Sequence, residues 1–143
     1  MHESNAQLIT DALAKNHTIV IACHCNVHYS GRAESYLDDG DRIILIKTDN
    51  TLLVHQATGN APINYMKPGT TYTITPRTDQ LHLHAQHPHL KEYMNIIISR
   101  IYFINTHKLD HGCDLELQGT EKDMSDHLYN NPHLIAQGFK TLS

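Results

Sequence analysis

The sequence lacks tryptophan and has only two phenylalanines among its 143 residues. It also lacks a long apolar run, because Ile96–Ile98 is followed by Ser99 and Arg100, and the run that begins at Ile19 ends before His24. A helix needs about 20 consecutive apolar residues to cross a bilayer, so no membrane-spanning helix is expected. The amino terminus carries neither a basic segment nor an apolar one, which argues against a secretory signal peptide.

Positive charge is scarce as well. Lys and Arg total 11 against 15 Asp and Glu, which gives a formal net charge of -4. This balance excludes a polybasic tail for nucleic acid or for an anionic membrane, but not a local basic groove. The 13 histidines outnumber Lys and Arg, so the sign of the net charge depends on pH in the mildly acidic range. Three cysteines without a secretion signal indicate reduced thiols in a cytoplasmic protein.

Signatures of nucleophilic or phosphate-transfer chemistry are absent. The sequence contains no G-x-S-x-G, no P-loop and no G-x-G-x-x-G. Cys23 and Cys25 share one face of an expected strand with apolar residues, which favours two buried thiols over a zinc site. These absences argue against an independent hydrolase of acyl bonds.

A histidine cluster offers a second candidate for metal binding. Its members are His82, His84, His87 and His89. The alternation with Leu81 and Leu83 predicts either a solvated outer strand face or an adventitious metal site. Histidine pairs on a strand lack the carboxylates and the lysine of a nuclease centre, so no metal is assigned to this chain.

Hydrophobic periodicity predicts a small, mostly antiparallel β unit between two helical ends. A helical stripe covers residues 7–15, and from Thr18 the period changes to two. A turn is predicted at 37–40 and a loop at 57–69. Further strands are predicted at 42–47, 51–56, 70–75, 80–85, 93–104 and 114–118.

The predicted strand 93–104 is long, bent and apolar on both faces. One side of a small sandwich requires only one apolar face. The second face is therefore expected to pack against another copy of the chain, or alternatively beneath the terminal helices.

The middle of the chain favours a binding surface over a catalytic centre. Cations and an aromatic ring occur there in turns, loops and strand ends, namely Tyr29, Arg32, Arg42, Lys47, Lys67 and Arg77. Cations neutralise nucleic-acid phosphates, and aromatic rings stack on bases regardless of sequence. Scattered surface cations are also ordinary in proteins, so this pattern leaves both interpretations open.

Several strings occur in a fixed order along the chain. They are VHYSGRA (27–33), GDRIILIK (40–47), LVHQ (53–56), PINYMKPG (62–69), GTEKDM (119–124) and NPHLIAQGF (131–139). This succession resembles the archaeal and actinobacterial endonuclease NucS, or EndoMS, family from Thr10 onward. The resemblance implies a mainly β domain with flanking helices, an antiparallel β-sandwich or half-closed barrel, over 1–118. Residues 119–143 would then be the first helices of a restriction-endonuclease-like domain.

The resemblance also implies a set of DNA-binding residues: Tyr29, Arg32, Arg42, Lys47, Asn64, Tyr65 and Lys67. Arg42 and Lys47 would hold phosphates or a flipped nucleotide. Asn64 and Tyr65 match an Asn-Trp pair whose ring stacks on an extruded base and whose amide meets a base edge. The smaller ring of Tyr65 is expected to stack less strongly, and pattern alone also permits a core aromatic at this position.

Catalysis is not expected of this chain by itself. Glu121 matches a family glutamate near the nuclease metal site, although it is equally suited to a helix amino terminus. The aspartate and the Glu-x-Lys pair that bind Mg²⁺ or Mn²⁺ in the family are expected after Phe139 and do not occur before Ser143. One glutamate cannot hold a catalytic magnesium, so no cofactor is assigned to this chain.

The expected function is therefore the DNA-binding and dimerisation region of a NucS-like endonuclease. The family implies a homodimer that holds mismatched, branched or single-stranded DNA with flipped bases. It also implies a sliding clamp as a partner, through a carboxy-terminal tail that these residues do not include. The alternative is a non-catalytic protein-interaction or regulatory module of the same fold, which the acidic balance and the missing tryptophan favour.

Overall fold

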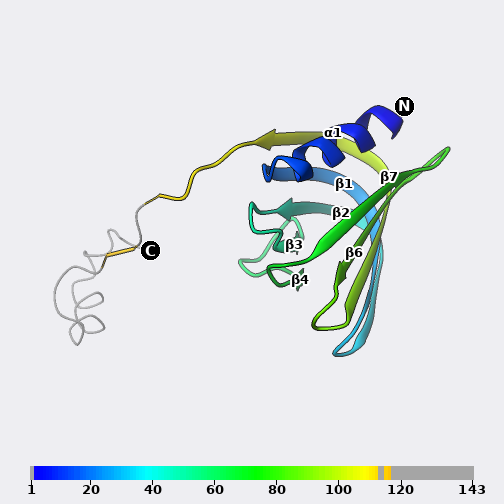
Figure 1. Cartoon of the computed structure of the whole chain (residues 1–143). Coiled ribbons are helices and arrows are strands. Elements are labelled where there is room, and N and C mark those ends of the chain that lie inside the picture. Colours follow the sequence, from blue (N-terminus) through cyan, green and yellow to red (C-terminus); the bar gives the residue numbers. More distant parts are fainter. Residues whose placement is uncertain (1, 113–114, 117–143) are drawn as a thin grey trace. The chain divides into compact units, whose positions relative to one another are not determined.

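The computed structural model describes residues 2–112 and 115–116, and one compact unit ends at Leu109. Within the described residues, this unit has one helix followed by seven strands (Figure 1). In chain order the elements are α1 (His2–Ala14), β1 (Thr18–Ser30), β2 (Glu34–Ile46), β3 (Leu52–His55), β4 (Asn64–Met66), β5 (Thr71–Pro76), β6 (Leu81–His87) and β7 (Glu92–His107). No described helix has the length and apolar character that crossing a membrane requires.

The seven strands form one antiparallel sheet in the order β4-β3-β2-β1-β7-β6-β5. The long central strand β1 pairs with β2 on one side and with β7 on the other. Its register shifts between Cys25 and Val27 toward β2, and twice between Ala22 and Cys25 toward β7. Because a bulge bends a strand and increases its twist, the sheet curls into a half-barrel (Figure 1). The mainly antiparallel, half-closed fold expected from the sequence is confirmed.

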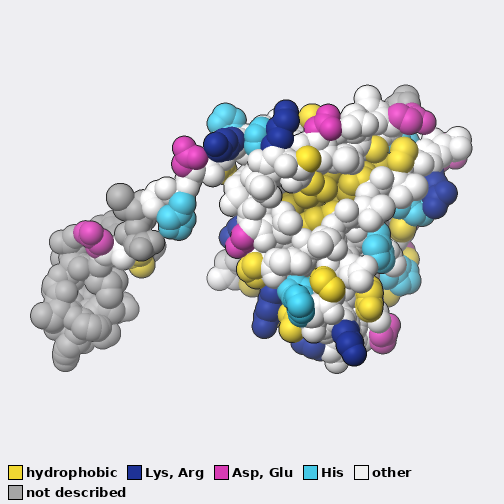
Figure 2. All heavy atoms as spheres, viewed as in Figure 1, with side chains coloured by type: hydrophobic (Ala, Val, Ile, Leu, Met, Phe, Trp, Pro, Cys, Tyr) yellow, Lys and Arg dark blue, Asp and Glu magenta, His cyan; other side chains and the backbone are white. Residues whose placement is uncertain are grey.

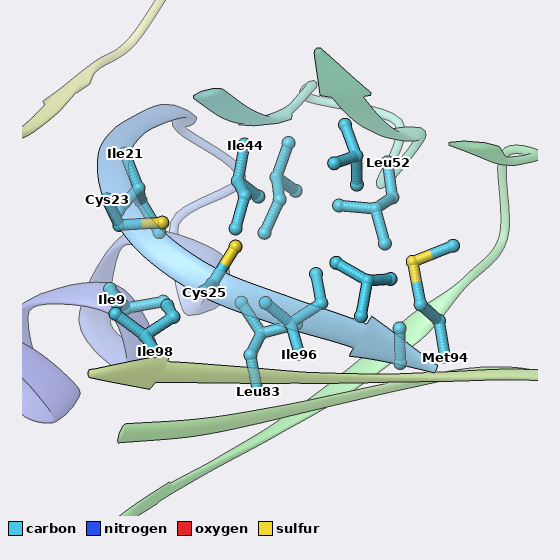
Figure 3. Close-up of a cluster of buried hydrophobic side chains, with 14 of the residues drawn as sticks. Ile9, Ile21, Cys23, Cys25, Ile44, Leu52, Leu83, Met94, Ile96 and Ile98 are labelled. Carbon is cyan, nitrogen blue, oxygen red and sulfur yellow. The ribbon is translucent and has the colours of Figure 1, made fainter. Parts of the chain in front are cut away.

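The hydrophobic core fills the inside of this curl. The inward residues of β1 alternate along the strand, and Ile19, Ile21, Cys23, Cys25 and Val27 are all fully buried. Figure 3 shows Ile21, Cys23 and Cys25 of β1 among buried side chains of the neighbouring strands, such as Ile44 and Ile96. Burying one such aliphatic side chain contributes about 1.5–3 kcal/mol, so the period-two pattern supplies much of the driving force for folding. The prediction that both thiols are buried is also confirmed.

Helix α1 packs against β5, β1 and β7. Its buried face is formed by Ala6, Ile9 and Ala12, while Leu8 is 41% exposed. The helix begins earlier than the predicted stripe at 7–15, and one member of that stripe faces solvent. Asn16, with a φ of 57°, adopts the left-handed conformation just after the helix, where asparagine is tolerated.

Two predictions about the connections are wrong. Residues 37–40 are not a turn, because β2 runs through them and the chain reverses at 31–33 instead. Asp38 and Asp39 lie opposite the single residue Asn26 of β1, so these turn-forming residues make a bulge in β2. The predicted loop 57–69 contains the short strand β4, which pairs with β3.

The other predicted strands of this unit are confirmed as antiparallel pairs, including the long strand that became β7. The predicted strand 114–118 lies mostly outside the described residues. The predicted helices in 119–143, the domain boundary at 118 and Glu121 lie outside them as well.

Candidate nucleic-acid interface

One end of the half-barrel gathers aromatic and charged side chains from three separate segments. Tyr29 lies near the end of β1, Arg32 in the following turn, Tyr65 on β4 and Glu92 at the start of β7. We call these four residues the Arg32 cluster. On the face that Figure 2 displays, Lys and Arg side chains gather along the rim at this end of the domain.

The guanidinium of Arg32 connects the other three side chains. Its Nε donates a hydrogen bond to the hydroxyl of Tyr29 at 3.0 Å, and its Nη1 donates to the hydroxyl of Tyr65 at 3.2 Å. The same Nε lies 3.1 Å from a carboxylate oxygen of Glu92. The guanidinium carbon is 5.6 Å from the centroid of the Tyr29 ring and 5.3 Å from that of Tyr65, within the range of cation–π attraction.

The Arg32 cluster has two buried members and two exposed members. Tyr29 is 5% exposed and Glu92 is 3% exposed, whereas Tyr65 is 37% exposed. The side chain of Arg32 keeps 53% of its surface accessible. The cluster therefore presents one aromatic ring and one guanidinium to solvent, and the buried Tyr29 and Glu92 hold the guanidinium.

Hydrogen bonding shifts the proton affinities of the exposed pair in opposite directions. The hydroxyls of Tyr65 and Tyr29 raise the pKa of Arg32 above its ordinary value. Donation from Arg32 lowers the pKa of Tyr65, with a smaller contribution from the charge of Lys67. Arg32 is therefore a permanent cation, and Lys67 adds a second positive charge to the surroundings of Tyr65.

Gly31 makes the close approach of the turn to β7 possible. A Cβ at this position would lie 2.8 Å from Cγ of Glu92 and 2.9 Å from the hydroxyl oxygen of Tyr29. It would also lie 3.2 Å from the backbone Cα of Glu92. No other residue fits here unless the turn moves away from β7, so this glycine maintains the geometry of the Arg32 cluster.

The remaining predicted site residues divide into two groups. Asn64 precedes Tyr65 on β4, and its side-chain oxygen accepts the Tyr65 backbone N–H at 3.0 Å. Lys67 is exposed just after β4. These two residues accompany Tyr65, so the structure brings them to the same end of the sheet as the Arg32 cluster.

Arg42 and Lys47 make their contacts elsewhere. Arg42 donates to the backbone carbonyl of Cys25 at 2.5 Å and to that of Asp38 at 2.8 Å, so it spans the bulge between β1 and β2. Lys47 lies exposed after β2, where its backbone N–H donates to the carbonyl of Thr51 at 2.9 Å. The contacts of Arg42 hold the bend of the sheet.

The predicted histidine cluster does not form one site. His82 and His84 lie on the outer face of β6, where their partners are Gln80 and Asn95. His87 instead points inward and is 7% exposed. Among the described residues, no group of three or more His, Cys, Asp or Glu side chains is placed to hold a metal ion.

Glu92 was missed by the sequence reasoning. It shares the inward-facing parity of β7 with Met94, Ile96 and Ile98, all of which are fully buried. A carboxylate on the apolar face of a strand is unusual unless it is paired. That parity was the available signal for a buried charge.

Residues 15–114 match the model of the endonuclease NucS N-terminal PH-like domain. The chain belongs to the NucS family. Endonuclease NucS of Thermococcus kodakarensis is 30% identical over 140 residues, which cover 98% of this chain and 55% of that protein. The NucS of Sulfurisphaera tokodaii is 33% identical over 127 residues, which cover 89% of this chain and 50% of that protein.

A solved structure of an EndoMS–dsDNA2 complex matches the fold with a TM-score of 0.79 and 29% sequence identity. The match covers 94% of this chain and 56% of the EndoMS chain. The chain thus spans about half the length of the NucS relatives that it matches. Its described unit corresponds to the amino-terminal domain of the family.

Proposed function

We propose that this chain is the DNA-binding and dimerisation region of a NucS-type endonuclease that acts on mismatched or branched DNA. The Arg32 cluster carries the proposal, because it presents a ring and a cation at one end of a domain that resembles EndoMS solved with DNA. The endonuclease names of the relatives support the same class of function.

The cluster has the chemistry that an extruded base requires. A base flipped from the duplex loses its stacking partners, and the half-exposed ring of Tyr65 offers a new one. Arg32 and Asn64 supply donors and acceptors beside that ring for the base edge. Lys67 and Lys47 are exposed cations suited to the phosphates. Flipping costs least at a mismatched or single-stranded base, which favours distorted DNA over a perfect duplex.

Homodimerisation is part of the same proposal. Strand β6 pairs with β7 only as far as Ile98, so the rest of β7 has β1 as its one neighbour among the described strands. On that segment Tyr102 is 51% exposed and Phe103 is 46% exposed. An open strand edge beside exposed aromatic rings is suited to pairing with a second copy of the chain.

Cleavage belongs to the longer family enzyme in this proposal. The aspartate and the Glu-x-Lys pair of its nuclease domain would bind Mg²⁺ or Mn²⁺, and its carboxy-terminal tail would bind a sliding clamp. The proposed location of the enzyme is the cytoplasm. The described residues bind the DNA and select mismatched or branched DNA over perfect duplex.

A gel-shift series at fixed salt tests the proposal. The 143-residue chain is titrated into mismatched duplex, branched DNA, single strand and perfect duplex, and each titration is repeated at several salt concentrations. We expect the first three to bind more tightly than the perfect duplex. Equal weak binding to all four contradicts the proposal, and no salt-sensitive binding at low ionic strength favours the protein-interaction module instead.

A further inference from the structure

We propose that Glu92 is a specificity-determining residue: its buried carboxylate neutralises Arg32, so that Arg32 contacts bases and not phosphates. This inference rests on the proposed DNA-binding function. It assigns a role to a residue that lies behind the exposed surface of the Arg32 cluster. Glu92 acts through Arg32, so it is a positioning residue.

The burial of Glu92 requires a partner of opposite charge. Only 3% of the residue is exposed, and its carboxylate lies 3.1 Å from Nε of Arg32. Transferring an ionised carboxylate out of water is costly unless a cation and hydrogen bonds compensate it. The turn that follows β1 supplies this cation, and Gly31 allows the turn to approach closely enough.

His87, which could also carry a positive charge next to Glu92, does not supply it. His87 is paired with Glu92 in the register of β6 and β7 and is itself buried. Its Nδ1 accepts the backbone N–H of Leu90 at 3.2 Å, so its Nε2 carries the proton and donates to the carbonyl of Pro68 at 2.9 Å. Both bonds together define the neutral imidazole. Among the described residues, Arg32 forms the ion pair with Glu92.

The ion pair changes what Arg32 contributes to DNA binding. Salt-sensitive affinity arises from protein cations that neutralise phosphates and release counterions. An arginine already neutralised by a carboxylate at 3.1 Å adds little to that effect. Its half-exposed guanidinium still offers N–H donors to a base edge beside the Tyr65 ring. The carboxylate thereby limits non-specific attraction to undistorted duplex at the position where a flipped base is received.

The test is the salt dependence of binding by Glu92→Gln, with Glu34→Gln as the matched control. Glu34 lies at the same end of the domain, is exposed and accepts a hydrogen bond from Ser30 at 2.7 Å. Both substitutions remove one negative charge, but only the first removes the partner of Arg32. Binding constants are measured by fluorescence anisotropy for mismatched and perfect duplex across a salt series.

We expect Glu92→Gln to steepen the slope of log Kobs against log salt by about 0.9 for duplex DNA, which corresponds to one additional phosphate contact. Perfect duplex should gain affinity, and the preference for mismatched DNA should fall. Glu34→Gln should change neither quantity. An unchanged slope in Glu92→Gln, or equal changes in both variants, overturns the inference.

The double variant Arg32→Gln/Glu92→Gln provides a second test, because it leaves no buried charge unpaired. We expect the wild-type salt slope together with weaker binding to mismatched DNA. A slope shallower by about 0.9 shows that Arg32 is an ordinary phosphate contact and overturns the inference. If the wild-type chain shows no preference for mismatched DNA, the proposed function and this inference both fail. A normal wild-type preference with the wrong slopes refutes only the role of Glu92.

Discussion

Replacing Tyr65 with alanine is expected to weaken binding to flipped-base DNA while leaving the fold intact. The ring is 37% exposed and lies on a short strand at the sheet edge, so its removal opens no cavity in the core. The folded state loses one hydrogen bond from Arg32 at 3.2 Å and one cation–π contact at 5.3 Å. At exposed positions such contacts contribute roughly 0.5–1.5 kcal/mol each, so the free energy of unfolding should fall only modestly.

The loss of DNA affinity should be larger than the loss of stability. Stacking of one base on an aromatic side chain contributes about 1–3 kcal/mol, which corresponds to roughly a 5- to 150-fold increase in Kd. Fluorescence anisotropy with mismatched and single-stranded oligonucleotides at constant salt measures this change. Thermal unfolding of the same protein samples measures the effect on stability.

Three further substitutions test whether the affinity depends on the ring of Tyr65, on its hydroxyl group, or on any exposed tyrosine. Tyr65→Phe keeps the ring and removes only the bond to Arg32, so it should retain most of the affinity. Tyr65→Trp enlarges the stacking surface and should bind more tightly. Tyr36→Ala removes another exposed tyrosine, one that packs on His28 at 4.3 Å, and should leave Kd unchanged. A Tyr65→Ala protein with wild-type Kd, or an equal loss in Tyr36→Ala, would refute the stacking role.

Other substitutions test the packing around the Arg32 cluster, the pH dependence of stability and the formation of the homodimer. Gly31→Ala should destabilise the fold by about 1–3 kcal/mol in chemical denaturation, because its Cβ would lie 2.8 Å from Glu92, whereas Gly112→Ala, with nothing within 4 Å, should have no effect. Asp49 accepts two hydrogen bonds from Thr51, which lower the pKa of its carboxyl group in the folded protein. Its contribution to the stability of the fold is therefore complete above the unfolded-state pKa of 3.8, and it is lost as pH falls through the lowered pKa of the folded state. The Tm of Asp49→Asn should accordingly decline less on acidification than that of wild type, and parallel Tm curves would contradict this. Phe103→Asp should convert the expected homodimer to a monomer by light scattering, and a wild-type chain that is already monomeric at micromolar concentration would remove the dimer proposal.

Much of the fold could be predicted from the sequence because one physical signal dominates it. Alternating burial along β1 and the apolar faces of β6 and β7 follow directly from the period of two in the sequence. Turn-forming residues were a poorer guide to where the chain reverses. The Asp-Asp-Gly segment of β2 has the composition of a turn, but it forms a bulge, since both features require an irregular backbone. The short strand β4 lies among proline and glycine residues, where three residues are too few for a periodic pattern.

The site was predictable only in part, because it depends on how the sheet bends. Family resemblance predicted DNA-binding roles for Tyr29, Arg32 and Tyr65, but it did not predict the contacts that the folded sheet brings about between them. In the sequence, Arg42 and Arg32 are both arginines near a turn signal and are not distinguished. The structure separates them, because the guanidinium of Arg42 donates to backbone carbonyls of Cys25 and Asp38. Glu92 is a single carboxylate on the apolar face of β7, and its partner, Arg32, lies far away in the sequence.

The ratio of Kd values for perfect and mismatched duplex, measured by competition at one salt concentration, tests the central claim most directly. The account predicts that the wild-type chain prefers the mismatched duplex, and that Tyr65→Ala binds both duplexes with similar weak affinity. A wild-type ratio of one, or a preference that survives Tyr65→Ala unchanged, would contradict the account.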